Sequence, residues 1–147
     1  MIAIGNDHAG YELKEAVKAY LESKNIEYKD YGTYNTDSCD YAVYAEKVAR
    51  AVVSGECEKG LLFCGTGVGI SIAANKVRGI RAACCSDLFS AEATRLHNDA
   101  NVLCMGGRVV TKEQAIALCD KFLTTAFTGE ERHLRRIAQI TDLENRF

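Results

Sequence analysis

Short apolar runs alternate along the chain with longer stretches in which apolar residues recur at helical spacing. The short runs predict five strands, at residues 2–5, 27–31, 60–63, 81–84 and 102–104. The longer stretches predict helices at residues 12–23, 41–53, 68–76, 90–96 and 112–122. In the first of these helices, one face carries Leu13, Val17, Tyr20 and Leu21. Strands and helices that alternate without a linker or a low-complexity break indicate an α/β domain.

The length and charge of the chain limit what it is expected to bind. With 147 residues, 48% of them hydrophobic, it can bury one sizeable core, so we expect a single domain over residues 1–147. Beyond residue 124 the chain turns basic, which predicts a C-terminal helical extension from about residue 128. The 18 basic and 20 acidic residues give a net charge of −2. Nucleic acid and anionic membranes are therefore not expected partners, whereas small molecules and proteins are.

The chain start and the cysteines predict a cytoplasmic protein with reduced thiols. Met1 leads directly into an apolar run, and no segment approaches the length of a membrane span. The seven cysteines include no Cys-x-x-Cys pair and no histidine at metal-ligand spacing, so we expect no metal site. Four cysteines lie in apolar context and are expected to pack in the core: Cys84, Cys85, Cys104 and Cys119.

Cys64 is the exception, because it stands where a buried strand is predicted to turn into a helix. It opens the run Cys64-Gly65-Thr66-Gly67-Val68-Gly69. Its glycines allow a sharp turn that brings main-chain N–H groups close to a ligand, and the following helix directs its positive dipole end there. We expect an exposed thiol whose thiolate form is favoured. The alternative is a buried cysteine before an ordinary glycine turn.

Further polar residues follow other predicted strands, and ligands collect at that edge of a parallel sheet. Asp7 and His8 follow the first strand, and Arg108 follows the fifth after two glycines. A carboxylate and an imidazole side by side suit proton transfer on a sugar, although Asp7 alone is also a good helix cap. His97 and Asn98 instead precede the fifth strand, in a turn-like sequence. They reach the same edge only if a helix or loop carries them back, or if a second subunit presents them.

Three arginines lie in the basic stretch near the C-terminus. Arg132 and Arg136 are one helical turn apart and face the same way, whereas Arg135 points partly aside. The first two suit a phosphate group, and a solvated basic face is the alternative. Together with the thiol, the histidines and Asp7, they suggest an enzyme that acts on a small phosphorylated sugar. Neither G-x-G-x-x-G nor G-x-x-x-x-G-K-[ST] occurs, which disfavours dinucleotide and nucleoside triphosphate binding.

Five segments carry a resemblance to a known family. They are Asp7-His8-Ala9-Gly10, Cys64-Gly65-Thr66-Gly67-Val68-Gly69-Ile70-Ser71-Ile72-Ala73-Ala74-Asn75-Lys76, Gly79-Ile80-Arg81-Ala82-Ala83, His97-Asn98-Asp99-Ala100-Asn101-Val102-Leu103 and Arg132-His133. In them the chain resembles ribose-5-phosphate isomerase type B, in the wider family that includes the galactose-6-phosphate isomerase subunits. The segments occur in order and span nearly the whole chain.

The resemblance implies a Rossmann-like three-layer α/β/α sandwich with a five-stranded parallel sheet. It also implies a homodimer or a dimer of dimers with active sites shared between subunits. The implied reaction interconverts ribose 5-phosphate and ribulose 5-phosphate through an enediolate, without a cofactor or a metal.

The resemblance also implies a role for each site residue. Cys64 would move the proton between C2 and C1, while Thr66 and the main chain of Gly65, Gly67, Val68 and Gly69 would stabilise the developing oxyanion. Asp7 and His97 would open the furanose ring, and Asn98 and Tyr41 would contact the sugar. The implied phosphate ligands, some of them from the neighbouring chain, are His8, Arg108, Arg132 and Arg136.

The chain departs from the family pattern at two positions. Many family members carry prolines where this chain has Ala42 and Arg78, and it contains no proline at all. Because the first position belongs to a loop that touches the sugar in such enzymes, the substrate range is open. Isomerisation of a six-carbon sugar phosphate such as allose or galactose 6-phosphate is one alternative function, and a non-catalytic sugar-phosphate sensor is another.

Overall fold

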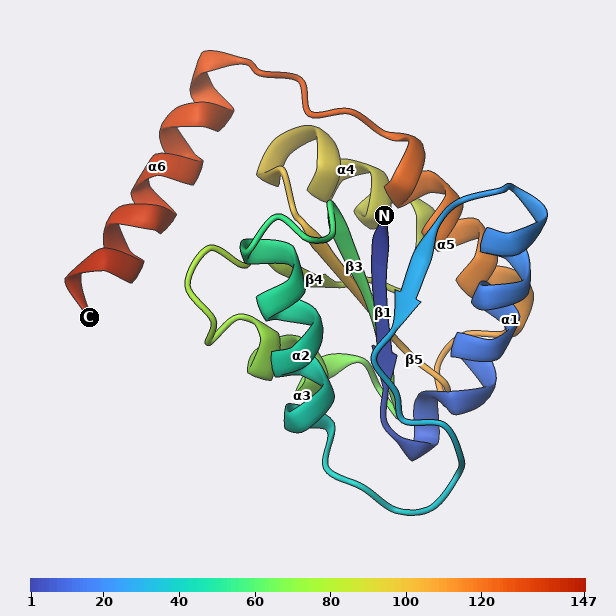
Figure 1. Cartoon of the computed structure of the whole chain (residues 1–147). Helices are drawn as coiled ribbons and strands as arrows, with labels where there is room; N and C mark the ends of the chain where they lie inside the picture. The colour runs from blue at the N-terminus through green and yellow to red at the C-terminus, as the bar shows by residue number, and fades with distance from the viewer.

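The computed structural model describes residues 1–147 and contains one five-stranded sheet with helices on both sides (Figure 1). The strands are β1 (Ile2–Asn6), β2 (Tyr28–Asp30), β3 (Lys59–Cys64), β4 (Ala82–Cys84) and β5 (Val102–Gly106). The helices are the short 3₁₀ helix η1 (His8–Gly10), α1 (Tyr11–Ser23), α2 (Tyr41–Val53), α3 (Val68–Ala74), α4 (Leu88–Asn98), α5 (Lys112–Thr124) and α6 (Glu131–Arg146). All strand pairs are parallel, in the order β2-β1-β3-β5-β4.

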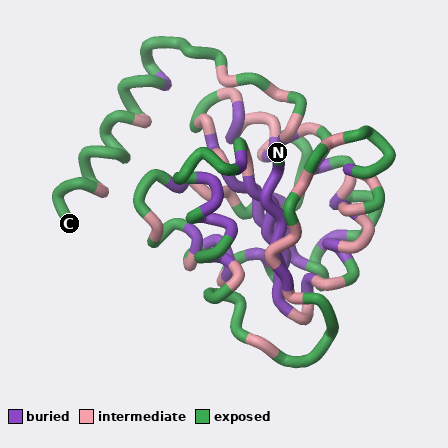
Figure 2. The backbone as a smooth tube through the Cα atoms, viewed as in Figure 1, coloured by how far each residue is buried: buried purple, intermediate pink, exposed green.

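The sheet is buried on both faces because successive side chains point to opposite sides of each strand. On β3, Leu61 and Phe63 face a core shared with α1, α4 and α5. Leu62 and Cys64 face a second core shared with α2 and α3. The buried parts of the chain accordingly concentrate in the strands and the inner helix faces (Figure 2). The predicted α/β fold, a Rossmann-like three-layer sandwich on a parallel sheet, is confirmed.

The predicted element boundaries hold closely except around α3 and α4. Helix α3 ends at Ala74 rather than residue 76, because the Asn75 side chain both accepts from and donates to the backbone of Ala82, at 2.8 and 2.9 Å. Helix α4 is longer than predicted. It begins after Asp87, whose side chain accepts a hydrogen bond from the Ser90 N–H, and it ends where Asp99 adopts a left-handed conformation. His97 and Asn98, predicted in a turn, therefore form the last residues of a helix.

Helix α6 projects away from the sheet and is exposed along most of its length (Figures 1 and 2). Its one buried residue is His133, near its start. Near its end, the Glu144 carboxylate accepts two hydrogen bonds of 3.1 Å from the Gly79 N–H. Leu134 and Leu143 are each 51% exposed, so this helix presents apolar side chains to the outside. None of the helices of the chain combines the length and apolar character needed to cross a membrane.

Three of the four cysteines that were expected to pack in the core do so: Cys85, Cys104 and Cys119 are buried. The expectation for Cys84 is wrong, because this residue is exposed. It ends β4, which is an edge strand of three residues. An edge strand this short leaves the side chain at its end open to solvent.

A buried lysine ties helix α1 to the loop that follows β2. Lys14 is fully buried, and its Nζ lies 3.0 Å from Asp30 Oδ2 and donates to the carbonyl oxygen of Thr33. Lys18, one helical turn later, also reaches Asp30 Oδ2, at 3.6 Å, but its side chain is 29% exposed. The two lysines therefore pair with the same carboxylate, Lys14 from the interior and Lys18 from a partly exposed position.

Replacing Lys14 by methionine is expected to lower the free energy of unfolding by about 3 kcal/mol, because Asp30 loses its buried partner. Lys18→Met is the matched control and is expected to cost less than about 1 kcal/mol, as for other exposed pairs. Chemical denaturation at a fixed protein concentration measures both values. Equal losses in the two variants would show that the buried Lys14–Asp30 pair stabilises the fold no more than the exposed Lys18–Asp30 pair does.

Candidate active site

A pocket of about 330 Å³ lies at the edge of the sheet where the parallel strands end. Its wall consists of Asp7, His8, Ala9, Cys39, Asp40, Tyr41, Gly65, Thr66 and Arg108. Six of the predicted site residues therefore meet in one chain: Asp7, His8, Tyr41, Gly65, Thr66 and Arg108. They follow β1, β3 and β5 or begin α2. A parallel sheet brings such residues together where its strands end.

Asp7 and His8 are held in place by hydrogen bonds to the main chain. Asp7 Oδ1 accepts from the N–H groups of Ala9 and Gly10, at 2.9 and 3.1 Å, so this carboxylate does cap η1. Only 5% of Asp7 is exposed. His8 Nδ1 accepts from the Cys39 N–H at 3.2 Å, which places the proton of the neutral ring on Nε2. The pocket thus contains a rigid carboxylate beside an imidazole with a donor at Nε2.

The Cys64 loop has the conformation that its glycines predict. Gly67 adopts φ +82° before α3 begins, and its N–H donates to Cys64 Sγ at 3.1 Å. The Val68 N–H donates to Thr66 Oγ1 at 3.2 Å. The loop therefore directs main-chain N–H groups at the sulfur and at the Thr66 hydroxyl.

The expectation of an exposed thiol is wrong. Cys64 is 4% exposed and is not part of the pocket wall. The reason is the strand alternation, which points its side chain into the core between the sheet and helices α2 and α3. The next two residues, Gly65 and Thr66, do line the pocket.

Two pocket residues, Tyr41 and Arg108, lie close to glycines. The Tyr41 ring lies against Gly69, where an added Cβ would come within 2.7 Å of the Tyr41 Cζ. Glycine at position 69 is therefore what lets this tyrosine approach the first turn of α3. The Arg108 guanidinium lies over Gly65, at 3.2 Å from the position of a Cβ. Arg108 forms no ion pair with any carboxylate, unlike Arg132 and Arg135.

The remaining predicted site residues gather elsewhere, around the end of α4 and the start of α6. The Thr128 N–H donates to the Leu96 carbonyl oxygen at 3.4 Å, which brings the two helices together. The His97 ring then stacks on the His133 ring, with centroids 4.5 Å apart and an interplanar angle of 19°. Burial lowers the pKa of His133, and the neighbouring His97 and Arg132 lower that pKa further.

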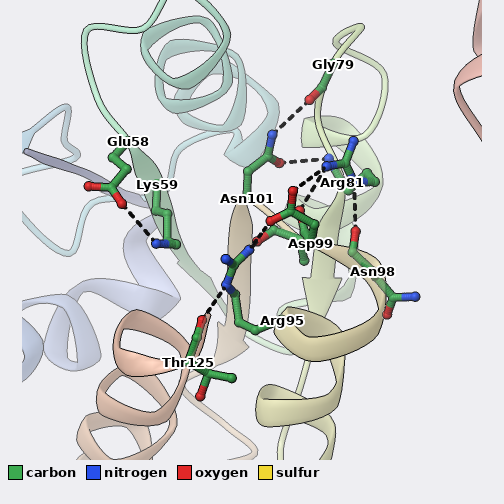
Figure 3. Close-up of polar contacts among 10 residues, drawn as sticks. Glu58, Lys59, Gly79, Arg81, Arg95, Asn98, Asp99, Asn101 and Thr125 are labelled. Carbon is green, nitrogen blue, oxygen red and sulfur yellow. Dashed lines mark hydrogen bonds and ion pairs between the residues drawn. The ribbon is translucent and has the colours of Figure 1, made fainter. Parts of the chain in front are cut away.

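Arginine side chains fix the backbone just after His97 (Figure 3). Arg81 donates to the carbonyl oxygens of Asn98 and Asp99, at 2.9 and 3.0 Å. Arg95 donates to Asp99 Oδ1 at 2.8 Å and to the Ala100 carbonyl oxygen at 2.7 Å. Cations at the end of α4 satisfy carbonyl groups that no helical N–H reaches and oppose the negative end of the helix dipole.

Within one chain, His97 and its neighbours lie at the end of the sheet where the strands begin, whereas the Cys64 loop lies at the end where the strands finish. Cys64 pairs with Gly106 at the end of β5, whereas the Asn101 carbonyl accepts from the Gly60 N–H at the start of that strand. The length of β5 alone separates these edges by roughly 13 Å. No helix or loop carries His97 back, so a single chain does not assemble the whole predicted site.

The three C-terminal arginines differ in their partners. Arg135 pairs with Glu131 and Arg132 with Glu130, both at 3.1 Å and both exposed. Arg136 forms no ion pair and is exposed. Arg132 and Arg136 both lie in α6, four residues apart, so they share a helix face as predicted.

The two positions without proline are accommodated simply. Ala42 is the second residue of α2, a helix that begins at Tyr41 without proline. Arg78 Nη2 donates to the carbonyl oxygen of Phe147 at 3.4 Å and so contacts the chain end.

Sequence reasoning assigned no role to four residues that support the His97 group: Arg81, Arg95, Asp99 and His133. Arg81, Asp99 and His133 fall within the segments that carry the family resemblance, which is the one signal that marked them. The contacts of Arg81 and His133 join residues that are far apart in the sequence, and helical or strand periodicity does not reveal such contacts. Arg95 and Asp99 instead form an i,i+4 pair, which helical spacing could have indicated.

The comparisons with known proteins agree with this geometry. A family model described as Ribose/Galactose Isomerase matches residues 2–140. Ribose-5-phosphate isomerase B of Escherichia coli (strain K12) is 48% identical over 145 residues, which cover 99% of this chain and 97% of that protein.

Solved structures agree as well. A ribose-5-phosphate isomerase B from Clostridium thermocellum has a TM-score of 0.97 at 47% identity, covering 99% of this chain and 97% of that one. The Mycoplasma genitalium ribose-5-phosphate isomerase B, solved with bound ribulose-5-phosphate, has a TM-score of 0.93 at 39% identity, covering 99% of this chain and 97% of that one. With its fold, its sequence and the order of its motifs in agreement, the chain belongs to the ribose/galactose isomerase family.

Proposed function

We propose that this protein interconverts ribose 5-phosphate and ribulose 5-phosphate without a cofactor, with Cys64 as the base. The observation that carries the proposal is the pocket at the carboxyl edge of the sheet, where Asp7, His8, Tyr41 and Arg108 surround the Cys64 loop. The chain's membership of the isomerase family supports the reaction type. The pentose is the first choice of substrate because the relatives above are named for it.

Two hydrogen-bond donors of the pocket suit the phosphate group. His8 Nδ1 accepts a hydrogen bond from the Cys39 N–H, so the His8 Nε2–H remains free to donate to a ligand. Arg108 has no carboxylate partner and so has its donors free for phosphate oxygens. In this proposal Arg132 and Arg136 of a second copy complete the phosphate site.

The reaction begins with ring opening. The hydroxyl at C1 loses its proton, the C1–O4 bond breaks, and O4 takes up a proton, so that one group accepts a proton and another donates one. Asp7 and His97 take these two roles. Asn98 and Tyr41 contact the sugar during this step.

Proton transfer between carbons follows on the open chain. The Cys64 thiolate takes the proton from C2 of the aldose, which leaves an enediolate, and the thiol then returns a proton to C1. Meanwhile O1 gains a proton and O2 loses one, so the sum is the ketose. Thr66 and the main-chain N–H groups from Gly65 to Gly69 stabilise the negative oxygen, as preorganised donors do in other enzymes.

A second copy of the chain is needed to complete the site. His97, Asn98, Arg132 and Arg136 lie at the wrong edge of their own sheet, so a two-fold dimer that exchanges them supplies each pocket. The exposed apolar side chains beside the pocket offer a contact surface: Val68 and Ile72 on α3 and Leu88 and Phe89 on α4 are 50%, 56%, 48% and 79% exposed. A homodimer, or a dimer of such dimers, follows.

Replacing Cys64 by alanine is expected to lower kcat for ribose 5-phosphate at least about 100-fold, because the base is lost. Binding of the sugar phosphate, measured by calorimetry, should persist. Cys104→Ala is the matched control, since Cys104 is a buried thiol in the same core and takes no part in the proposed chemistry. Full activity of the Cys64 variant would refute the assigned base.

Mixing two inactive variants tests the shared site. Cys64→Ala and His97→Ala chains, unfolded together and refolded in equal amounts, should regain about one quarter of the wild-type activity. Half of the dimers are then mixed, and each mixed dimer holds one intact site of two. If both residues served one chain's own pocket, the mixture would stay as inactive as its parents.

Substrate length distinguishes the pentose from a hexose. The kcat/KM for ribose 5-phosphate is expected to exceed the values for allose 6-phosphate and galactose 6-phosphate at least about tenfold, because an extra carbon must be housed in the pocket. Coupled assays of the ketose products measure all three values. A higher value for either hexose would assign the enzyme to six-carbon substrates.

A further inference from the structure

His133 is the one buried residue of α6, and its ring contacts the ring of His97. Only 6% of His133 is exposed, and its Nε2 is buried without a hydrogen-bond partner. A buried imidazole nitrogen without a partner costs free energy. The position therefore gains little from polar contacts, and its ring stack is the interaction that the structure shows.

The backbone of the His97 turn is already fixed by other groups. Arg81 holds the carbonyl oxygens of Asn98 and Asp99, and Arg95 holds the Asp99 carboxylate and the Ala100 carbonyl (Figure 3). None of these contacts reaches the imidazole of His97, which is an exposed side chain at the end of a helix. What remains to be set is the rotation of that ring about its side-chain bonds.

We propose that His133 is a positioning residue, whose ring fixes the orientation in which His97 is presented to the sugar. The proposal rests on the proposed isomerase function and adds a role for a residue that no step of the reaction uses. Two nearly parallel rings at 4.5 Å restrict the rotation of the exposed one.

Two variants separate the ring from its nitrogens. His133→Ala removes the stacked surface, whereas His133→Phe keeps a flat ring and removes both nitrogens. Gln139→Ala is the control for changes on α6, because Gln139 is exposed and forms no side-chain hydrogen bond. His97→Ala provides the reference for complete loss of the presented group.

Two reactions separate ring opening from proton transfer. Isomerisation of ribose 5-phosphate requires the furanose to open. Exchange of the C1 proton of ribulose 5-phosphate with deuterated water does not, because this ketose carries its phosphate on the oxygen that would close a five-membered ring. A variant that misplaces the ring-opening group is slowed in the first reaction more than in the second, whereas a merely destabilised enzyme loses both alike.

His133→Ala is expected to slow isomerisation roughly 10- to 100-fold, the scale of a misplaced catalytic group, and to slow proton exchange no more than about threefold. His133→Phe should recover most of the isomerisation rate, and Gln139→Ala should match the wild type. Equal losses in both reactions for His133→Ala, or a phenylalanine variant as slow as the alanine one, would overturn the proposal.

A spectroscopic readout needs no activity, so it separates this proposal from the proposed function. The chain has three histidines, whose ring C–H signals in NMR spectra can be assigned by single replacements. The His97 signals should move in His133→Ala, as the ring current of the neighbour is lost, and return most of the way in His133→Phe. Unchanged His97 signals in His133→Ala would show that the stack is absent in solution, even if the wild type isomerises ribose 5-phosphate.

Discussion

A parallel sheet separates the residues that follow a strand from those that precede one, and the rest of the site depends on this constraint. Asp7, the Cys64 loop and Arg108 all follow strands, so they meet at one edge. His97 precedes β5 and lies at the other edge, beside His133. A pocket built from both groups therefore needs two chains. In this interpretation the dimer is a consequence of topology, because Cys64 ends β3 and His97 lies near the end of α4, so that each is fixed at its own end of the sheet.

The Cys64 loop combines a buried sulfur with a main-chain donor. Strand alternation points the side chain into the core, and the turn through Gly67 directs a main-chain N–H at the sulfur. Burial limits the reaction of a thiol with solutes. In the proposed function, the sugar phosphate binds beside Gly65 and Thr66, the two residues that follow Cys64.

The sequence predicted the fold well because local patterns decide it. Strand β3 reads as an apolar run, and α1 carries its apolar residues on one face, so both elements follow from periodicity. The same reasoning placed His97 in a turn, since His-Asn-Asp is turn-like, and missed that α4 continues through Asn98 and ends only at the left-handed Asp99. It also missed the exposure of Cys84, which depends on β4 being an edge strand. The stack of His97 on His133, the burial of Cys64 and the partners of Arg81 depend on tertiary contacts that no local pattern encodes.

The partners of the arginines distinguish those that hold structure from those available to a ligand. Arg95 is buried and donates to Asp99, Ala100 and Thr125, so removing it would leave two carbonyl oxygens without this donor and Asp99 with Arg81 as its remaining partner, at 3.6 Å. Arg108 and Arg136 have no acidic partner. Arg132 has one, Glu130, but the pair is exposed on both sides and contributes little free energy. In the proposed function, a phosphate with two negative charges replaces Glu130 at a small cost in free energy. Arg132 is therefore available to the ligand although it forms an ion pair in the free protein.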